Sequence, residues 1–207
     1  MKRELIYGTR PVLATLHSRR REVFEVLDAS GSAEVAEAAA GVPLKKVPRA
    51  RIEDLARGAA HQGVAASVGP YPYSDLGEIL AAPDPLVLLL DGVTDPRNLG
   101  AVLRAADGAG ASGVVIPKSR AVGVTAAAVK ASAGASEHAS VARETNLRRA
   151  IDRVKEAGVW VYAAEVGGTA YTGLDLSGPV AFVLGSERRG APGCCGQGRA
   201  LPVLGAR

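Results

Sequence analysis

The segment PLVLLLDGVTDPRNLGAVLRAADGAGASGVVIP, residues 85–117, has the clearest structural pattern in the sequence. It opens with a continuous apolar run, residues 86–90, bounded by Pro85 and Gly92. Such a run is typical of a strand buried on both faces of a parallel sheet. Apolar residues then recur at helical spacing from Leu99 to Asp107, and residues 112–117 form a second apolar run. The order strand, helix, strand predicts a unit of a parallel α/β sheet.

The same segment contains the pattern G-x-G-x-x-G, from Gly108 to Gly113. In a dinucleotide-binding fold this pattern follows a strand and opens a helix, because the pyrophosphate binds at the amino end of that helix. Here the order is reversed, since the glycines end one helix and lead into the next strand. We therefore interpret them as a helix C-cap and a tight turn, which sets aside a nicotinamide-dependent oxidoreductase.

Strands and helices continue to alternate toward the C-terminus. Residues 124–135 and 146–158 have helical patterns, and residues 159–165 and 179–185 have strand patterns. These elements predict a doubly wound α/β fold with its ligand site at the carboxyl ends of parallel strands.

The first third of the chain predicts a separate, smaller α/β domain. Residues 10–17 and 32–41 have helical patterns, and residues 21–29 alternate apolar and polar residues as a half-buried strand does. The following stretch, PYPYSDLGEILAAPDP, is rich in Pro and Tyr and has no sustained period, so we expect a linker there. The expected division is residues 1–69, a linker at 70–84 and a second domain at 85–207.

Composition excludes several classes of protein. The sequence has no apolar run long enough for a membrane span and no signal-peptide core, so we expect a cytoplasmic protein without a membrane partner. The two cysteines, Cys194 and Cys195, are adjacent, and the sequence has no second Cys/His pair that could complete a metal site. We expect ordinary thiols and no bound metal.

A mild positive charge makes a nucleic-acid partner possible. The formal net charge is +4 and the sequence pI is about 9.3. The run Arg19-Arg20-Arg21 is the densest basic stretch of the first domain. It is either a solvated surface or a contact for RNA or DNA, and charge alone leaves both open.

Two loops that follow predicted strands could form one site. In the first, Asn98 stands where a helix cap is expected, and Leu99, Val102, Leu103 and Ala106 form the apolar stripe of the helix. Arg104 lies about 140° from Leu99 at about 100° per residue, so it can project toward a cleft. The second loop, residues 184–190, follows the strand pattern VAFVL. The alternative is a capping asparagine and a solvated arginine.

Three stretches resemble motifs of a known family: DPRNLGAVLRAADGAGASGVVIP, KASAGASEH and FVLGSERRG. They are similar to the first motif, the middle segment and the second motif of the SpoU branch of the SPOUT methyltransferases. These enzymes transfer a methyl group from S-adenosyl-L-methionine to an RNA ribose 2′-hydroxyl. Upstream, IYGTRPVLATL and HQGVAA resemble the start and end of the ribosomal-protein-like domain of bacterial 23S ribosomal RNA guanosine 2′-O-methyltransferases. The resemblance covers about residues 4–190.

The resemblance implies a set of site residues. Arg104 would be the catalytic arginine, Asn98 would help to shape the active site, and Glu187 would hold the loop of the second motif. The cofactor would bind at four positions, Leu184, Gly185, Gly190 and Leu201. Residues His61 and Gln62 would join Arg19, Arg20 and Arg21 as RNA contacts. The family fold is a parallel sheet with a trefoil knot, in a homodimer.

The sequence departs from the family pattern after Gly190. The third motif of the family is missing, and the chain reads APGCCGQGRALPVLGAR from Ala191 to its end. We interpret this stretch as a truncated or frame-shifted C-terminus in which the knot is incomplete. The leading hypothesis is a ribosomal RNA ribose methyltransferase, and the alternative is an RNA-binding protein or inactive remnant without a complete cofactor pocket.

Overall fold

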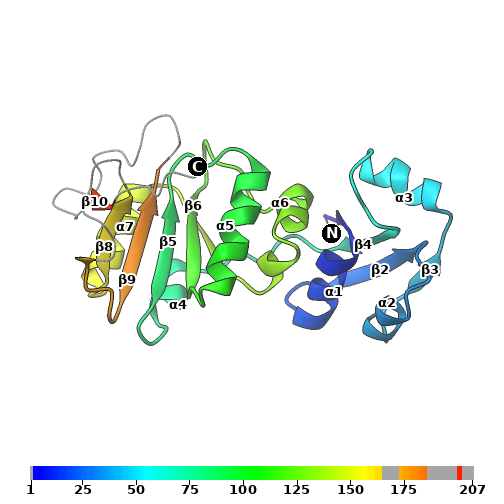
Figure 1. Ribbon diagram of the computed structural model, residues 1–207, viewed down its shortest axis with the longest axis horizontal. Helices are drawn as coiled ribbons and strands as arrows, with labels where there is room; N and C mark the ends of the chain where they lie inside the picture. Colours follow the sequence, from blue (N-terminus) through cyan, green and yellow to red (C-terminus); the bar gives the residue numbers. More distant parts are fainter. Residues whose placement is uncertain (1, 165–172, 186–199, 202–207) are drawn as a thin grey trace. The chain divides into compact units, whose positions relative to one another are not determined.

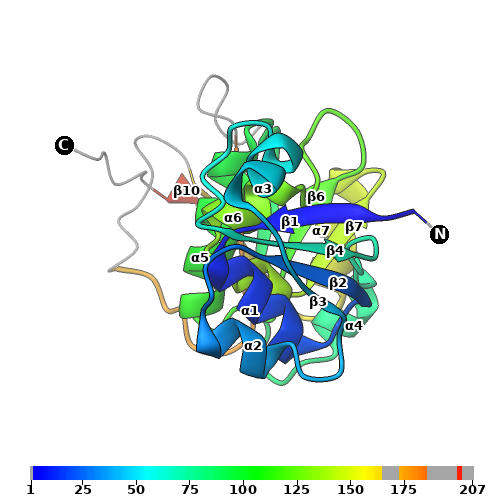
Figure 2. The same ribbon diagram turned by 90° about the vertical axis from the view of Figure 1, so that its right-hand side faces the viewer.

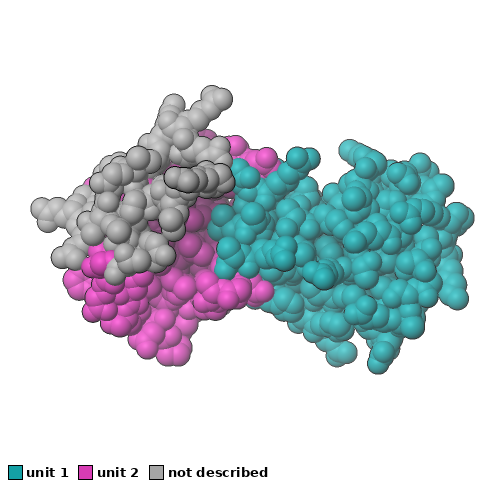
Figure 3. Space-filling model, in the orientation of Figure 1, with its two compact units in different colours: residues 1–72, 96–105, 124–138 teal, residues 73–95, 106–123, 139–207 magenta. Residues whose placement is uncertain are grey.

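The computed structural model describes residues 2–164, 173–185 and 200–201 (Figure 1). The chain forms two compact units, which Figure 3 distinguishes by colour. Unit 1 contains residues 1–72, 96–105 and 124–138, and unit 2 contains residues 73–95, 106–123 and 139–207. No helix in the described ranges is long and apolar enough to cross a membrane.

Unit 1 is built on a four-stranded sheet in the order β1-β4-β2-β3 (Figure 2). Its strands are β1 (Glu4–Tyr7), β2 (Val23–Asp28), β3 (Leu44–Lys46) and β4 (Val64–Val68). Strand β4 pairs antiparallel with β1 and β2, whereas β2 and β3 are parallel. The alternation of apolar residues in the sequence predicted β2, and the structure confirms it.

Helices cover both faces of this sheet. Helices α1 (Thr9–Ser18) and α2 (Ala33–Ala38) lie on one face, and α3 (Arg49–Ala56) lies on the other (Figure 2). Ile52 of α3 is fully buried in a cluster with Leu27 and Ala65 of the strands. Unit 1 also includes the first ten residues of α5 (Pro96–Gly108), α6 (Ala126–Ala131) and the 3₁₀ helix η1 (Ala135–Glu137).

Unit 2 contains a six-stranded sheet in the order β10-β8-β9-β5-β6-β7, and every pair in it is parallel. The strands are β5 (Leu86–Leu90), β6 (Gly113–Pro117), β7 (Val141–Glu144), β8 (Trp160–Ala164), β9 (Val180–Leu184) and β10 (Ala200–Leu201). Helices α4 (Leu76–Leu80) and α7 (Leu147–Glu156) pack on one face of this sheet in a shared apolar core. The predicted parallel α/β fold is confirmed.

The structure corrects the expectation for residues 70–84. This stretch includes α4, whose Asp75 and Glu78 form a reciprocal capping box at its amino end. Leu76 and Ile79 of this short helix are buried in the core of unit 2. The helix was not predicted because five residues are too few to show a period. The packed unit therefore begins at residue 73.

A second correction concerns the start of α5. The helix begins at Pro96, so Asn98 lies inside its first turn and not at the cap position. Proline suits the first position of a helix because its missing N–H has no partner there and its φ is already close to helical. The predicted apolar stripe is confirmed at Leu99 and Leu103, which are fully buried.

The glycines after α5 have the role that their sequence context predicted. The amide of Ala111 donates to the oxygen of Ala106 at 2.9 Å, and that of Gly110 donates to Asp107 at 3.0 Å. With a φ of 67° at Gly110, these bonds form a Schellman motif that ends the helix. Gly113 then begins β6, where a Cβ atom would lie 2.5 Å from the side chain of Ile79. These glycines therefore serve the helix end and the packing of β6, as their reversed order predicts.

Candidate functional site

The carboxyl ends of four neighbouring strands are in register in unit 2. Leu90 of β5 pairs with Leu184 of β9, Leu184 pairs with Ala164 of β8, and Ala164 pairs with Leu201 of β10. The amide of Asp91 extends the ladder by donating to the oxygen of Leu184 at 2.8 Å. The four paired residues form one row of backbone across the end of the sheet, which we call the strand-end row.

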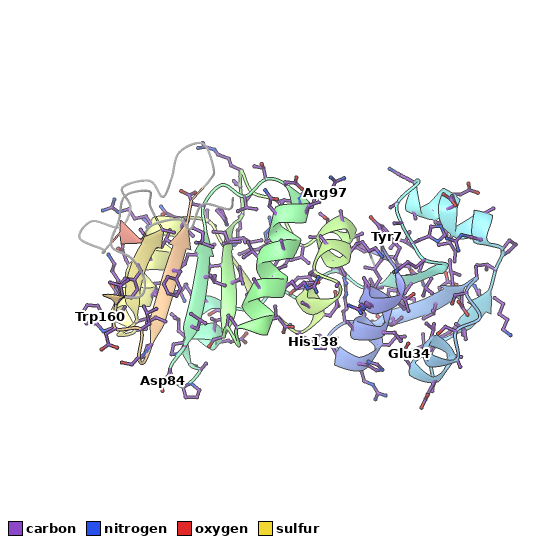
Figure 4. All side chains as sticks on the ribbon, viewed as in Figure 1. Tyr7, Glu34, Asp84, Arg97, His138 and Trp160 are labelled. Atoms are coloured by element: carbon purple, nitrogen blue, oxygen red, sulfur yellow. The ribbon has the colours of Figure 1, made fainter. Side chains whose placement is uncertain are left out.

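The strand-end row contains the point where the direction of winding changes. From β5 the chain adds β6 and β7 on one side, and it then returns to add β8 and β9 on the other. In open parallel sheets, ligands bind outside the carboxyl ends at such a switch point. The opposite ends of β5 and β8 carry Asp84 and Trp160 (Figure 4). Sequence reasoning placed two loops in one site, and the strands that lead into them are paired neighbours.

The predicted cofactor residues fall partly on this row. Leu184 and Leu201 belong to it, and the half-buried Gly185 follows Leu184 directly. Leu201 is placed by the pairing of its backbone with Ala164. Glu187 and Gly190 lie outside the described residues.

The predicted catalytic residues lie on the helix that follows β5 in the chain. Asn98 and Arg104 are both exposed on α5, in its first and third turns. Figure 4 shows Arg97 at the amino end of the same helix. The burial of Leu99 and Leu103 fixes which side of the helix faces the core, and therefore leaves Arg104 on the solvent side.

Two of the predicted RNA contacts are buried, which corrects their assignment. The Arg21 residue is 7% exposed, and its guanidinium is paired with Glu137. His61 is 3% exposed, and its Nδ1 atom accepts a hydrogen bond from the amide of Gly63 at 3.1 Å. A side chain with so little surface cannot lie against an RNA strand, so we assign both residues to the packing of unit 1.

The other three predicted RNA contacts have accessible surface. Arg19 is exposed at the carboxyl end of α1, and Arg20 is half-buried with its Nη1 atom donating to the oxygen of His138 at 3.1 Å. Gln62 is exposed, and its Oε1 atom accepts from the amide of Thr9 at 3.2 Å and from Lys130 Nζ at 2.8 Å. Partial burial lowers the pKa of Lys130 below its ordinary value.

Sequence reasoning missed an exposed basic cluster on β3 and α3. It consists of Lys45, Lys46, Arg49 and Arg51, and all four side chains are exposed. The signal was present, because residues 38–52 contain no aspartate or glutamate. Two of these cations lie in the first turn of α3, where the positive end of the helix dipole disfavours them. A negatively charged partner would offset that repulsion.

The described residues contain no group of three or more His, Cys, Asp or Glu side chains that could hold a metal ion.

A methyltransferase family accounts for both halves of the chain. Residues 85–194 match the model of the SpoU rRNA Methylase family, and residues 5–74 match that of the RNA 2′-O ribose methyltransferase substrate-binding domain. The chain belongs to the SpoU methylase family. The resemblance in the motifs is thereby confirmed.

Similar proteins agree with this assignment. The chain is 42% identical over 156 residues to the putative TrmH family tRNA/rRNA methyltransferase YacO of Bacillus subtilis, a match that covers 72% of this chain and 62% of that protein. The putative TrmH family tRNA/rRNA methyltransferase of Staphylococcus haemolyticus is 43% identical over 153 residues. This match covers 71% of this chain and 61% of that protein. The chain thus matches about three fifths of the length of these relatives.

Solved structures share the fold. The AdoMet-bound rRNA methyltransferase of Sinorhizobium meliloti superposes with a TM-score of 0.81 at 26% identity, covering 99% of this chain and 79% of that one. The SpoU methyltransferase AviRb of Streptomyces viridochromogenes has the same TM-score at 22% identity, covering 98% and 81%. The latter likeness concerns the fold alone.

Proposed function

We propose that this protein transfers a methyl group from S-adenosyl-L-methionine to a ribose 2′-hydroxyl of ribosomal RNA, and that the target is a guanosine of 23S ribosomal RNA. The observation that carries the proposal is the strand-end row at the switch point of the sheet, in a chain of the SpoU methylase family. A relative with the same fold, the Sinorhizobium meliloti enzyme, binds AdoMet.

The residues of the strand-end row suit this cofactor. S-adenosyl-L-methionine has an adenine ring but no pyrophosphate, so it needs no glycine-rich turn at the start of a helix. The half-buried side chain of Leu184 offers an apolar contact for the adenine, and the backbone of Gly185 offers polar groups without a side chain in the way. When bound, the cofactor supplies an electrophilic methyl group.

Arg104 is proposed to orient the ribose and to stabilise charge on its 2′-oxygen. A guanidinium remains protonated under nearly all conditions, so electrostatic stabilisation suits it better than proton abstraction. Displacement at a methyl group depends mainly on an in-line approach and on stabilisation of the developing negative charge. Asn98 is proposed to help to shape the active site, and Glu187 to hold the loop of the second motif.

We propose that unit 1 binds the RNA. Its candidates are the exposed Arg19 and Gln62, the half-buried Arg20, and the basic cluster on β3 and α3. Phosphate contacts by such side chains give affinity without reading the base. We also propose that the protein is a homodimer and acts in the cytoplasm.

The test is to identify the product. The purified chain is incubated with 23S ribosomal RNA and isotopically labelled S-adenosyl-L-methionine, and the RNA is digested to nucleosides for mass spectrometry. We expect label in a 2′-O-methylguanosine. Label on a base would contradict ribose methylation.

The alternative is an RNA-binding protein that does not transfer methyl groups, and it is favoured by the departure of the sequence from the family pattern after Gly190. Isothermal calorimetry distinguishes the two. Binding of S-adenosyl-L-methionine by the chain supports the methyltransferase, whereas RNA binding without any cofactor binding supports the alternative.

A further inference from the structure

A buried ion pair in unit 1 joins two distant parts of the sequence. Arg21 Nε donates to Glu137 Oε2 at 3.0 Å, and Arg21 Nη2 donates to Glu137 Oε1 at 2.5 Å. The two side chains are 2% and 1% exposed. Arg21 lies just before β2, while Glu137 is the last residue of η1, and 116 positions separate them. The pair therefore connects the stretch that matches the substrate-binding domain with the stretch that matches the methylase.

Other polar contacts enclose this pair. The guanidinium of Arg21 lies 5.8 Å from the ring centre of Tyr71, and Nη1 approaches the oxygen of Gly69 at 3.5 Å. The hydroxyl of Tyr71 donates to the oxygen of Ser136 in η1 at 2.8 Å. An arginine and a tyrosine of the substrate-binding stretch thus both bind η1, so two side chains hold this short helix.

Close packing continues from η1 to the helix that carries Arg104. Ser132 Oγ, at the end of α6, accepts from the amide of Ser136 at 3.2 Å. Helix α6 in turn touches α5 at Gly100, where a Cβ atom would lie 2.5 Å from the Cβ atom of Ala131 and 2.6 Å from the oxygen of Ala128. The two helices are therefore so close at Gly100 that a Cβ atom would not fit between them. An unbroken series of contacts therefore runs from Arg21 to α5.

We propose that Arg21 and Glu137 are positioning residues, which fix the helix of Arg104 relative to the RNA-binding surface of residues 1–72. A buried ion pair is a weak source of stability, because desolvation of two charges offsets most of their attraction. Its contribution is to fix an orientation, since both hydrogen bonds of a bidentate pair form only when the guanidinium and the carboxylate face each other. The part of this inference that concerns catalysis rests on the function proposed for Arg104.

The coupling itself can be measured without any activity. Spin labels are attached at Glu34→Cys on α2 and at Ala101→Cys on α5, both exposed, in a chain with Cys194→Ser and Cys195→Ser. Pulsed electron paramagnetic resonance then gives the distribution of distances between the two labels. Labelled protomers are diluted with an excess of unlabelled ones, so that only distances within one protomer are measured. We expect one narrow distribution in the otherwise unaltered chain and a broad one with Arg21→Met, which leaves the buried carboxylate of Glu137 without its partner.

A matched control and a milder variant keep this test decisive. Glu25→Gln removes the carboxylate of another ion pair in unit 1, the 2.6 Å contact with Lys45, and should leave the distribution narrow. Glu137→Gln removes the charge but keeps the shape, so it covers the case in which Arg21→Met does not fold, as judged by circular dichroism. An equally narrow distribution in both Arg21→Met and Glu137→Gln would overturn the proposal.

Kinetics then separate positioning from a purely structural role. At a temperature where the variant is fully folded, single-turnover methyl transfer at saturating RNA should fall about 10- to 100-fold in Arg21→Met, because small displacements of reacting groups are costly. Cofactor affinity should stay within about twofold, as ground-state contacts at the strand-end row are unaltered. An unchanged rate would reject the catalytic role of the pair. If the unaltered chain transfers no methyl group, the proposed function fails, and the distance measurement still decides the coupling.

Discussion

Gly100→Ala should destabilise the protein although alanine is the better helix former. The new Cβ atom would lie 2.5 Å from the Cβ atom of Ala131, 2.6 Å from the oxygen of Ala128 and 2.9 Å from the nitrogen of Ser132. Overpacking of this kind costs about 1–3 kcal/mol, and two of the three atoms are backbone of α6 and its cap, which places Gly100 near the upper limit. The higher helix propensity of alanine offsets about 1 kcal/mol of this cost. The expected net loss in free energy of unfolding is about 2 kcal/mol.

Gly108→Ala is the matched control, because Gly108 is the last residue of the same helix and no atom lies within 4 Å of a Cβ atom built there. This variant should be unchanged or more stable by about 0.4–1 kcal/mol, through the smaller entropy of its unfolded chain. Urea denaturation followed by circular dichroism measures both variants. Equal stabilities would refute the close approach of α5 and α6 on which the proposed coupling depends.

Three further predictions concern unit 1. Tyr71→Phe should lower the free energy of unfolding by about 1 kcal/mol, because it removes a buried 2.8 Å hydrogen bond, and a change below about 0.3 kcal/mol would argue against that bond. Gly134→Ala should cost at least about 2 kcal/mol in the same assay, since its φ is +95° and a Cβ atom would lie 2.6 Å from a side chain of α1; a neutral result would contradict the local packing. Lys46→Gln with Arg49→Gln should reduce the slope of log affinity for RNA against log salt by about one for each phosphate that is no longer neutralised, and an unaltered slope would make the basic cluster a merely solvated surface.

The parts of the fold with strong local signals could be predicted from the sequence. Strands β5 and β9 are continuous apolar runs, and α5 has an unbroken apolar stripe. These patterns indicate the type of each element and the side of the helix that is buried. Helix α4 is too short to show a period. Strand β7 was also missed, because Val141–Glu144 combines two buried residues with two half-buried charged ones at the edge of the sheet.

The position of Leu184 and Gly185 at the end of a parallel strand could be predicted from the sequence, because a buried apolar strand leads into them. Their role in cofactor binding stays a prediction. Arg21, by contrast, belongs to a basic run of a kind that is usually solvated, and its partner lies 116 positions away. No local pattern shows that a charged side chain will be buried against so distant a carboxylate, so the sequence alone places the whole run at the surface.

The account depends most directly on Arg104, and single-turnover methyl transfer to a 23S ribosomal RNA fragment tests it. Arg104→Ala should reduce the rate by roughly 100- to 1,000-fold, with cofactor affinity unaltered, because a group that stabilises charge in the transition state is removed. Arg104→Lys should recover little of this loss, since an ammonium lacks the planar fork of the guanidinium. Arg148→Ala, another exposed helix arginine, is the control and should transfer at the normal rate. A normal rate in Arg104→Ala would contradict the account and return Arg104 to the role of a solvated surface residue.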